Sequence, residues 1–213
     1  MAGKTIVVVG AGGNAREIAQ ICSALGYSVL GFMADRRGEH DSELLGDFSW
    51  PEKNPVNCFA MGIGSPAAKL KVAQELIKRY PQIEWPALIH PTAFIGDSCT
   101  LGSGSVVCVR AVATVNVKIG EFTQLNFGCT AGHEAEIGAG TLVNPGANLA
   151  GGVKIGKRVM IGTGAQVLQY LAVGDDAIVG AGAVVTKDVP AGVTVVGVPA
   201  KALNKQTKVS VGR

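Results

Sequence analysis

The sequence predicts a small α/β domain with a parallel sheet, followed by a triangular β-helix built from six-residue repeats. Two observations predict the β-helix: glycine is very frequent, with 30 residues in 213, and aliphatic residues recur at every sixth position through most of the chain. A third observation predicts the α/β domain, because β-branched runs alternate with helical patterns before about residue 80. The low aromatic content of 5% fits a repetitive core of small aliphatic side chains.

The first predicted strand is the β-branched run Thr5–Val9, which is suited to a buried parallel strand. The segment Gly10-Ala11-Gly12-Gly13 follows it as a tight turn. Residues Ala15–Cys22 then place apolar side chains at helical spacing, and Asn14 is the predicted N-cap. The sequence therefore predicts a strand, a glycine-rich turn and a helix at the start of the chain.

The rest of the α/β domain shows the same alternation of predicted strands and helices. Ser28–Asp35 and Cys58–Ile63 are predicted strands, and Pro66–Arg79 is a predicted helix with proline in its first turn. Together they form a small Rossmann-like unit. Residues 39–55 are polar and turn-rich and support no assignment, while residues 81–86 are predicted to be a linker.

From Leu88 onward the chain has a period of six residues. The second residue of each hexad is aliphatic seventeen times in succession, which chance would produce roughly three times in a million at the observed hydrophobic content. These residues are Ile89, Ile95, Leu101, Val107, Ala113, Ile119, Leu125, Ala131, Ile137, Val143, Leu149, Ile155, Ile161, Val167, Val173, Val179 and Val185.

A six-residue unit can form a short strand and a corner, and three units close a triangular coil. The aliphatic residue then points inward and stacks on its equivalent eighteen residues later. Seventeen hexads give about 5.7 coils, or about 27 Å of stack at ~4.8 Å per coil. The position after the aliphatic residue is often glycine, where we expect a corner with positive φ. These glycines are Gly96, Gly102, Gly120, Gly138, Gly156, Gly162, Gly174 and Gly180.

Composition excludes several functional classes. The net charge is +3 with scattered basic residues, which argues against nucleic-acid binding. Five cysteines without a CxxC spacing argue against a disulfide framework or a zinc site and fit a reducing cytoplasm. The first nine residues are too short and too weakly basic for a signal peptide, and charges or glycines interrupt every apolar run. We therefore expect a cytoplasmic protein without membrane contact.

The repeats, followed by Gly197-Val198-Pro199-Ala200-Lys201, resemble the hexapeptide-repeat acyltransferases, whose fold is a left-handed parallel β-helix. The glycine-rich α/β domain in front resembles the bacterial subfamily of sialic acid O-acetyltransferases and nucleotide-amino-sugar N-acetyltransferases. The resemblance implies a Rossmann-like nucleotide-sugar-binding domain over residues 1–84. It also implies an all-β left-handed β-helix acetyltransferase domain over residues 85–213.

The candidate catalytic residues are His133 and Glu134. The hexad position of His133 points outward, and an imidazole titrates close to neutral pH, which suits a general base. A lone exposed His-Glu pair is usually ordinary surface, but the resemblance implies that His133 is the base and that Glu134 orients it. It also implies that the backbone N–H of Gly151 stabilises the oxyanion. Cys129 lies four residues before His133, but its small inward position argues against a cysteine nucleophile.

The resemblance implies that acetyl-CoA is the co-substrate and lies between neighbouring subunits of a homotrimer. Lys187 and Lys201 are candidates to meet the cofactor phosphates, although solvated lysines near a terminus are an equally good interpretation. Leu142 stands where some relatives carry a polar residue. The positions that match the cofactor groove, mostly through backbone groups, are Leu142, Gly151, Thr163 and Ala181.

The resemblance also implies that the N-terminal domain holds the nucleotide of a sugar nucleotide, because a glycine-rich turn brings backbone N–H groups close to phosphates. Asn14 stands where many relatives have histidine, and Ala34 stands where many have a second aspartate. Asn126 matches a sugar-contacting position, although an asparagine stacked at a coil corner is an equal alternative. The predicted nucleotide-binding residues are Gly12, Gly13, Asn14, Asp35 and Gly64.

The implied function is acetyl-CoA-dependent N-acetylation of a nucleotide-linked amino sugar in bacterial glycan biosynthesis, without a metal. One alternative is O-acetylation of a sugar such as sialic acid, and another is a non-catalytic sugar-binding β-helix. A zinc enzyme such as a γ-type carbonic anhydrase needs three converging histidines. His90 and His133 are 43 residues apart, which is not a multiple of eighteen, and His40 precedes the repeats. The sequence identifies neither the sugar nor the nucleotide.

Overall fold

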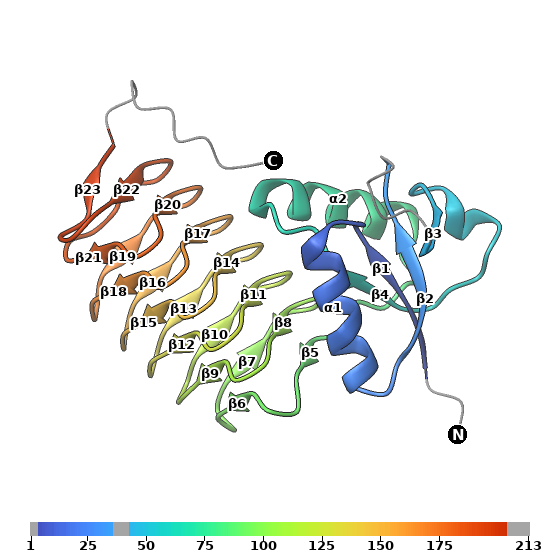
Figure 1. The fold of residues 1–213 in the computed structure, drawn as a ribbon, viewed down its shortest axis with the longest axis horizontal. Helices are drawn as coiled ribbons and strands as arrows, with labels where there is room; N and C mark the ends of the chain where they lie inside the picture. The colour runs from blue at the N-terminus through green and yellow to red at the C-terminus, as the bar shows by residue number, and fades with distance from the viewer. Residues whose placement is uncertain (1–3, 36–42, 204–213) are drawn as a thin grey trace.

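A computed structural model describes residues 4–35 and 43–203, and it places an α/β domain beside a parallel β-helix (Figure 1). The α/β domain has one parallel sheet in the order β3-β2-β1-β4, which is the order of the first four strands of a Rossmann fold. Its elements are β1 (Thr5–Val9), α1 (Gly13–Ala24), β2 (Ser28–Met33), β3 (Leu44–Gly46), a short 3-10 helix (Trp50–Glu52), β4 (Phe59–Met61) and α2 (Pro66–Arg79).

The α/β domain follows the sequence prediction closely, apart from the cap of the first helix. Helix α1 begins at Gly13 with Gly12 as its N-cap, so the prediction of Asn14 as N-cap is wrong. The Asn14 side chain is engaged elsewhere, since its Nδ2 donates to the carbonyl oxygen of Gly62 at 2.9 Å. Its Oδ1 accepts from Nε2 of Gln124, a residue of the β-helix, also at 2.9 Å. Asn14 therefore ties the two parts of the chain together.

The β-helix has three faces. Face 1 contains β5 (Leu88–Ile89), β8 (Val106–Val107), β11 (Gln124–Leu125), β14 (Leu142–Val143), β17 (Met160–Ile161), β20 (Ile178–Val179), β22 (Thr194–Val196) and the antiparallel β23 (Lys201–Ala202). Face 2 contains β6 (Phe94–Ile95), β9 (Val112–Ala113), β12 (Thr130–Ala131), β15 (Asn148–Leu149), β18 (Gln166–Val167) and β21 (Val184–Val185). Face 3 contains β7 (Thr100–Leu101), β10 (Lys118–Ile119), β13 (Glu136–Ile137), β16 (Lys154–Ile155) and β19 (Ala172–Val173).

The period of six is confirmed, because each predicted aliphatic residue is the second residue of one two-residue strand from β5 to β21. Strands pair in parallel with partners eighteen residues away, as Ile119 does with Leu101 on one side and Ile137 on the other. The stacked aliphatic side chains form the core of the β-helix. Ile89 and Ile95 are only partly buried since they lie in the first coil, which no coil covers from below.

The structure corrects the reason for the repeated glycines. The predicted glycines do not have positive φ; the left-handed residues lie two positions later, as at Gly104 and Gly140. The predicted glycines are instead required by close stacking of the coils. A Cβ on Gly138 would lie 2.5 Å from the carbonyl carbon of Gly156 in the next coil, which no side chain can tolerate.

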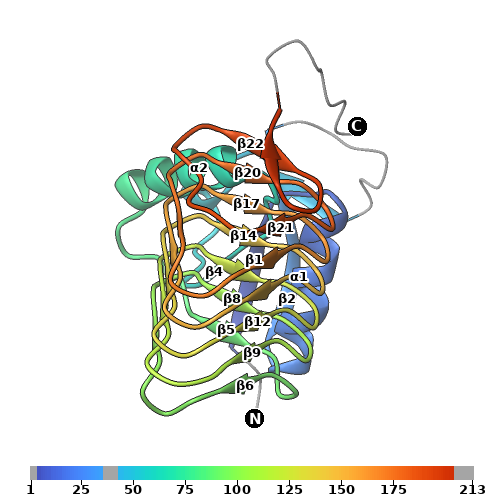
Figure 2. The same cartoon turned by 90° about the vertical axis from the view of Figure 1, so that its left-hand side faces the viewer.

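Helices α1 and α2 both lie against face 1 of the β-helix (Figure 2). One core cluster combines α1 side chains with Leu88 and Val106 of β5 and β8. A second contains Trp85, whose ring meets Phe59 and Phe122 edge to face with centroids 5.3 and 5.2 Å away. The prediction of residues 81–86 as a linker is therefore wrong, because buried side chains of this segment join the two parts.

Candidate active site

His133 and Glu134 lie in the turn between β12 and β13, at the corner where face 2 meets face 3. We call this corner 2–3. Glu134 is left-handed, with φ of 54°, and its backbone N–H donates to the carbonyl oxygen of Val115 at 2.8 Å. Its carboxylate accepts a hydrogen bond from Nδ1 of His133. This bond, followed by the charge of His133 and a bond from Asn116, lowers the pKa of Glu134. The ionised carboxylate therefore holds the proton on Nδ1 and leaves Nε2 free to accept one.

The imidazole of His133 lies directly over Gly151, one coil further on. A Cβ at residue 151 would lie 2.3 Å from Nε2 of His133, so only glycine allows the ring this position. The backbone N–H of Gly151 donates to no acceptor among the described residues. The equivalent N–H groups of Val115 and Gln169 also have no acceptor among the described residues, so an open donor is a feature of this corner position. At Gly151 the donor lies beside His133 and is available to a ligand. A proton acceptor and an unpaired N–H donor thus lie side by side.

The column that contains His133 and Gly151 continues to Lys187, which occupies the same corner position two coils beyond Gly151. This places its Cα about 10 Å further along the stack, at ~4.8 Å per coil. Exposed apolar side chains flank the column: Leu168 and Tyr170 on the side of Lys187, and Val115 below His133. Along the stack, corner 2–3 therefore presents the His133 base, the N–H of Gly151, the apolar side chains of Leu168 and Tyr170, and finally the Lys187 cation.

The other predicted cofactor residues lie elsewhere. Thr163 and Ala181 are exposed in the turns between faces 1 and 2, at the corner we call corner 1–2. Lys201 is exposed on β23 at the end of face 1. Leu142 is only 7% exposed on face 1, so its side chain cannot reach a cofactor and only its backbone could. One chain by itself does not bring these residues to His133.

Asn126 also lies at corner 1–2, in the same coil as His133. It is only 6% exposed, and its Oδ1 accepts a hydrogen bond from the backbone N–H of Phe127 at 2.8 Å. This contact matches the alternative of an asparagine that stabilises a coil corner. The Nδ2 of Asn126 has no acceptor among the described residues, so the amide keeps donors for a ligand.

The predicted nucleotide-binding residues gather at the carboxyl ends of β1, β2 and β4, the edge where open α/β sheets bind ligands. A Cβ on Gly12 would meet nothing within 4 Å, so the start of α1 is open. Helix α1 has no acidic residue in its first turn, which favours an anion there. Gly64 faces Asn14, since a Cβ at residue 64 would lie 3.7 Å from Cβ of Asn14. Asp35 follows β2 and is exposed.

The structure argues against the other chemistries considered. Burial raises the pKa of the Cys129 thiol to about 12, so it is a poor nucleophile. In residues 4–35 and 43–203 no three His, Cys, Asp or Glu side chains gather to hold a metal ion, and His40 lies outside these residues. Within the same ranges, α1 and α2 lack the length and apolar character needed to cross a bilayer.

Sequence reasoning missed three residues around these sites. Gln124 bonds to Asn14, Lys69 of α2 is buried, and Arg110 is left-handed at corner 1–2. The hexad pattern could have indicated Gln124 and Arg110, because they occupy strand and corner positions that point out of the β-helix. The helical spacing places Lys69 on the same stripe as the buried Pro66, Ala73 and Leu76, but a lysine within such a stripe is usually solvated, so the pattern did not predict its burial.

Two family models match this chain. Residues 5–76 match the PglD N-terminal domain, and residues 134–169 and 152–187 match the bacterial transferase hexapeptide of six repeats. None of the curated protein sequences matches the chain significantly.

Solved structures match nearly the whole chain. Perosamine N-acetyltransferase from Caulobacter crescentus, a histidine-to-asparagine mutant in complex with CoA and GDP-perosamine, is 29% identical, with a TM-score of 0.88 over 94% of this chain and 97% of that one. The acetyltransferase domain of PglB from Neisseria gonorrhoeae is 30% identical, with a TM-score of 0.86 over 94% and 100%. WeeI from Acinetobacter baumannii is 30% identical, with a TM-score of 0.83 over 93% and 99%. The chain therefore belongs to the hexapeptide-repeat, acetyl-CoA-dependent acetyltransferases that carry a PglD-type N-terminal domain.

Proposed function

We propose that the enzyme transfers the acetyl group of acetyl-CoA to an amino group on a nucleotide-linked amino sugar, with His133 as the general base. The observation that carries the proposal is that Nε2 of His133 lies beside the N–H of Gly151, which has no acceptor among the described residues. The relatives support the substrate class, because perosamine N-acetyltransferase was solved with CoA and GDP-perosamine. The PglB acetyltransferase domain was solved with acetyl-CoA.

The chemistry is a direct transfer. The acceptor amine attacks the thioester carbonyl carbon while Nε2 of His133 takes a proton from the amine nitrogen. The carbonyl oxygen becomes an oxyanion, which the N–H of Gly151 stabilises. The C–S bond then breaks, and the imidazolium returns its proton to the CoA thiolate. Glu134 keeps the ring oriented and favours the imidazolium while it exists.

The two corners come together when copies of the chain associate. Corner 2–3 of one copy carries His133, Gly151 and Lys187, whereas corner 1–2 carries Thr163 and Ala181. A homotrimer that places corner 2–3 of one copy against corner 1–2 of the next would enclose acetyl-CoA between them. The exposed apolar side chains of Leu168 and Tyr170 support burial of corner 2–3 in such an interface.

The two parts of the chain divide the work. We assign the nucleotide to residues 1–84, through the open start of α1, Gly64 and Asp35, and acetyl transfer to residues 85–213. Because Trp85 packs against both parts, they share one hydrophobic core although we assign them different functions. Lys187 and Lys201 are the proposed contacts for the CoA phosphates.

The test is thiol release from acetyl-CoA with UDP-, GDP- and dTDP-linked amino sugars and with free sialic acid. His133→Ala is expected to lower kcat by about 100-fold or more, the usual contribution of a general base. Glu134→Gln keeps a hydrogen-bond acceptor without the charge and is expected to lower kcat with little change in either KM.

Turnover with sialic acid alone would replace the proposal with O-acetylation and leave the base in place. Full activity of His133→Ala would remove His133 from the mechanism. A wild-type protein that binds no acetyl-CoA would favour a sugar-binding β-helix instead.

A further inference from the structure

Two carboxylates of the β-helix are stacked directly above side chains that carry N–H donors. Glu134 and Asp176 both occupy the fifth position of a hexad. The residues eighteen positions earlier, in the coil below, are Asn116 under Glu134 and Arg158 under Asp176. Positive φ is common to this hexad position and distinguishes none of the four residues. What distinguishes them is that each acid has a side-chain donor beneath it, which is the arrangement that holds a carboxylate in place.

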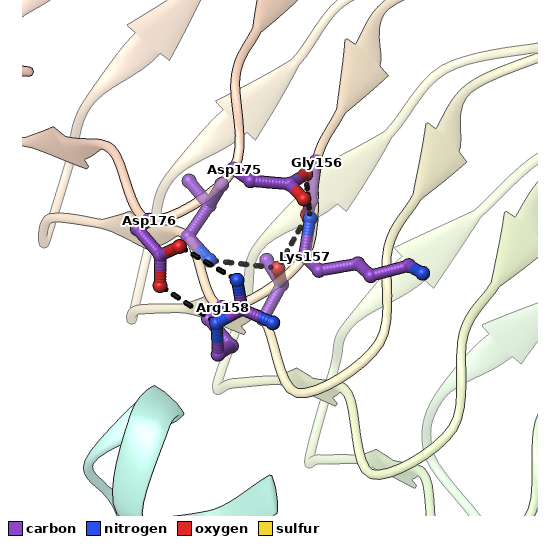
Figure 3. Close-up of polar contacts among 7 residues, drawn as sticks. Gly156, Lys157, Arg158, Asp175 and Asp176 are labelled. Carbon is purple, nitrogen blue, oxygen red and sulfur yellow. Dashed lines mark hydrogen bonds and ion pairs between the residues drawn. The ribbon is translucent and has the colours of Figure 1, made fainter. Parts of the chain in front are cut away.

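The stack of Arg158 and Asp176 lies where face 3 meets face 1, which we call corner 3–1 (Figure 3). Nε of Arg158 donates to Oδ1 of Asp176 at 2.7 Å, and Nη2 of Arg158 donates to Oδ2 at 2.6 Å. These hydrogen bonds, together with the charge of Arg158, lower the pKa of Asp176. A donor at this hexad position therefore fixes the carboxylate of the next coil.

The stack of Asn116 and Glu134 lies at corner 2–3 and ends on the candidate base. The side-chain hydrogen bond from Asn116 contributes, after the larger effects of His133, to the lowered pKa of Glu134. Among residues 4–35 and 43–203, the Asn116 amide has no other hydrogen-bond partner. The backbone N–H of Asn116 donates to Oγ of Ser98, one coil further down, at 2.9 Å. Hydrogen bonds thus connect Ser98, Asn116, Glu134 and His133 across three coils.

The two stacks differ in the charge of the donor. Arg158 forms an ion pair with Asp176 and neutralises it. An arginine at position 116 would compete with His133 for the carboxylate of Glu134. The amide of Asn116 donates a hydrogen bond without a positive charge, so it orients Glu134 and leaves the full negative charge for the imidazolium.

We propose that Asn116 is a positioning residue that holds the carboxylate of Glu134 against Nδ1 of His133. Both side chains of the His-Glu pair are exposed, and an exposed carboxylate that is held by one contact alone rotates into water. The second contact from Asn116 fixes its orientation before the substrates bind. Asn116 touches no reacting atom and acts through Glu134. The inference rests on the proposed function, and it adds a residue that prepares the base.

Two variants of the full chain separate the amide donor from the shape of the corner. Asn116→Gly removes the amide, and Gly152, with φ of 67° at the same hexad position of this corner, shows that glycine fits. Asn116→Asp keeps the size of the side chain but replaces the donor with an acceptor, and Asp176, with φ of 59°, shows that aspartate fits. Arg158→Gly is the matched control, because it removes a stacked donor at a corner without His133.

We expect Asn116→Gly and Asn116→Asp to lower kcat for acetyl transfer about tenfold, the effect of losing a hydrogen bond to a charged group, with little change in either KM. Arg158→Gly should keep the wild-type kcat. In a Glu134→Gly background, Asn116→Gly should lower kcat no further, because Asn116 acts through Glu134. Full activity of Asn116→Asp, or an equal loss from Asn116→Gly in both backgrounds, would overturn the inference.

A second measurement does not depend on turnover. NMR titration of 13C-labelled glutamate carboxyl groups follows Glu134, whose signal is assigned by its loss in Glu134→Gly. Asn116→Gly should raise the pKa of Glu134, because a donor to the ionised carboxylate is removed, whereas Arg158→Gly should leave it unchanged. An unchanged pKa in Asn116→Gly would overturn the inference whatever the activity. A raised pKa in a protein without acetyl transfer would instead overturn the proposed reaction and leave the hold of Asn116 on Glu134 standing.

Discussion

At the scale of single residues, the side chain of His133 is held by two neighbours from different coils. Glu134 accepts from Nδ1, and the missing side chain of Gly151 leaves room for the ring. A sequence motif can identify His133 and Glu134 because they are adjacent in the chain. The fit of Gly151 under the ring follows from the eighteen-residue coil, which brings residue 151 next to residue 133.

Lys69 is a buried lysine on α2, and only 2% of its surface is exposed. Burial lowers its pKa from 10.5 to about 8. Between these values the unfolded chain binds more protons than the folded one, so stability should rise with pH from about 8 to 10.5. Below pH 8 the buried charge costs about 3 kcal/mol, at 1.36 kcal/mol for each pKa unit.

Lys69→Met should therefore stabilise the protein at pH 7 by about 1–3 kcal/mol and abolish this rise of stability at high pH. Urea denaturation at pH 7 and pH 10 measures both effects. Lys71→Met, an exposed position on the same helix, is the control and should change neither. A loss of stability in Lys69→Met would mean that the ammonium has a favourable partner in the folded state.

At the scale of elements, each corner of the β-helix makes two different demands on glycine. Where the residue after the inward aliphatic side chain is glycine, as at Gly138, the backbone of the next coil lies against it and leaves no room for a Cβ. The left-handed residue two positions later needs only a tolerable φ, so larger side chains can occupy it, such as Arg158 and Asp176, which pair with each other (Figure 3). Glycine is therefore favoured at two positions of one hexad for two different physical reasons.

This distinction predicts different costs for two glycine-to-alanine substitutions. Gly138→Ala would place a Cβ 2.5 Å from the backbone of Gly156, and we expect a cost of about 3 kcal/mol or more. Gly164→Ala, with φ of 67° and nothing within 4 Å of its Cβ, should cost only about 1–2 kcal/mol. Urea denaturation at one fixed protein concentration compares them. The opposite order would refute the close-stacking explanation.

At the scale of the whole molecule, the candidate site is distributed over two corners and the edge of the α/β sheet. His133 and Lys187 lie at corner 2–3, while Asn126 and Thr163 lie at corner 1–2. The proposed trimer unites them across subunits, so each site would take residues from two chains.

Shared sites predict complementation between inactive variants. Co-expression of His133→Ala with Asn126→Ala should give mixed trimers in which some sites contain both native residues, and activity should exceed that of either variant alone. Sites contained within one chain would give no such gain, because neither chain has both residues. Light scattering that shows a monomer at micromolar concentration would exclude the trimer itself.

The sequence alone determined the repeat and its register, because three six-residue units close a coil and the inward aliphatic residues then stack on those eighteen residues later. It also predicted His133 and Glu134 as catalytic residues, through their adjacency and the resemblance. Tertiary structure decided the rest: the bond from Gln124 to Asn14, the burial of Lys69 and Leu142, and the core role of Trp85. These depend on how the α/β domain packs on face 1, and contacts between residues far apart in the chain leave no periodic signal.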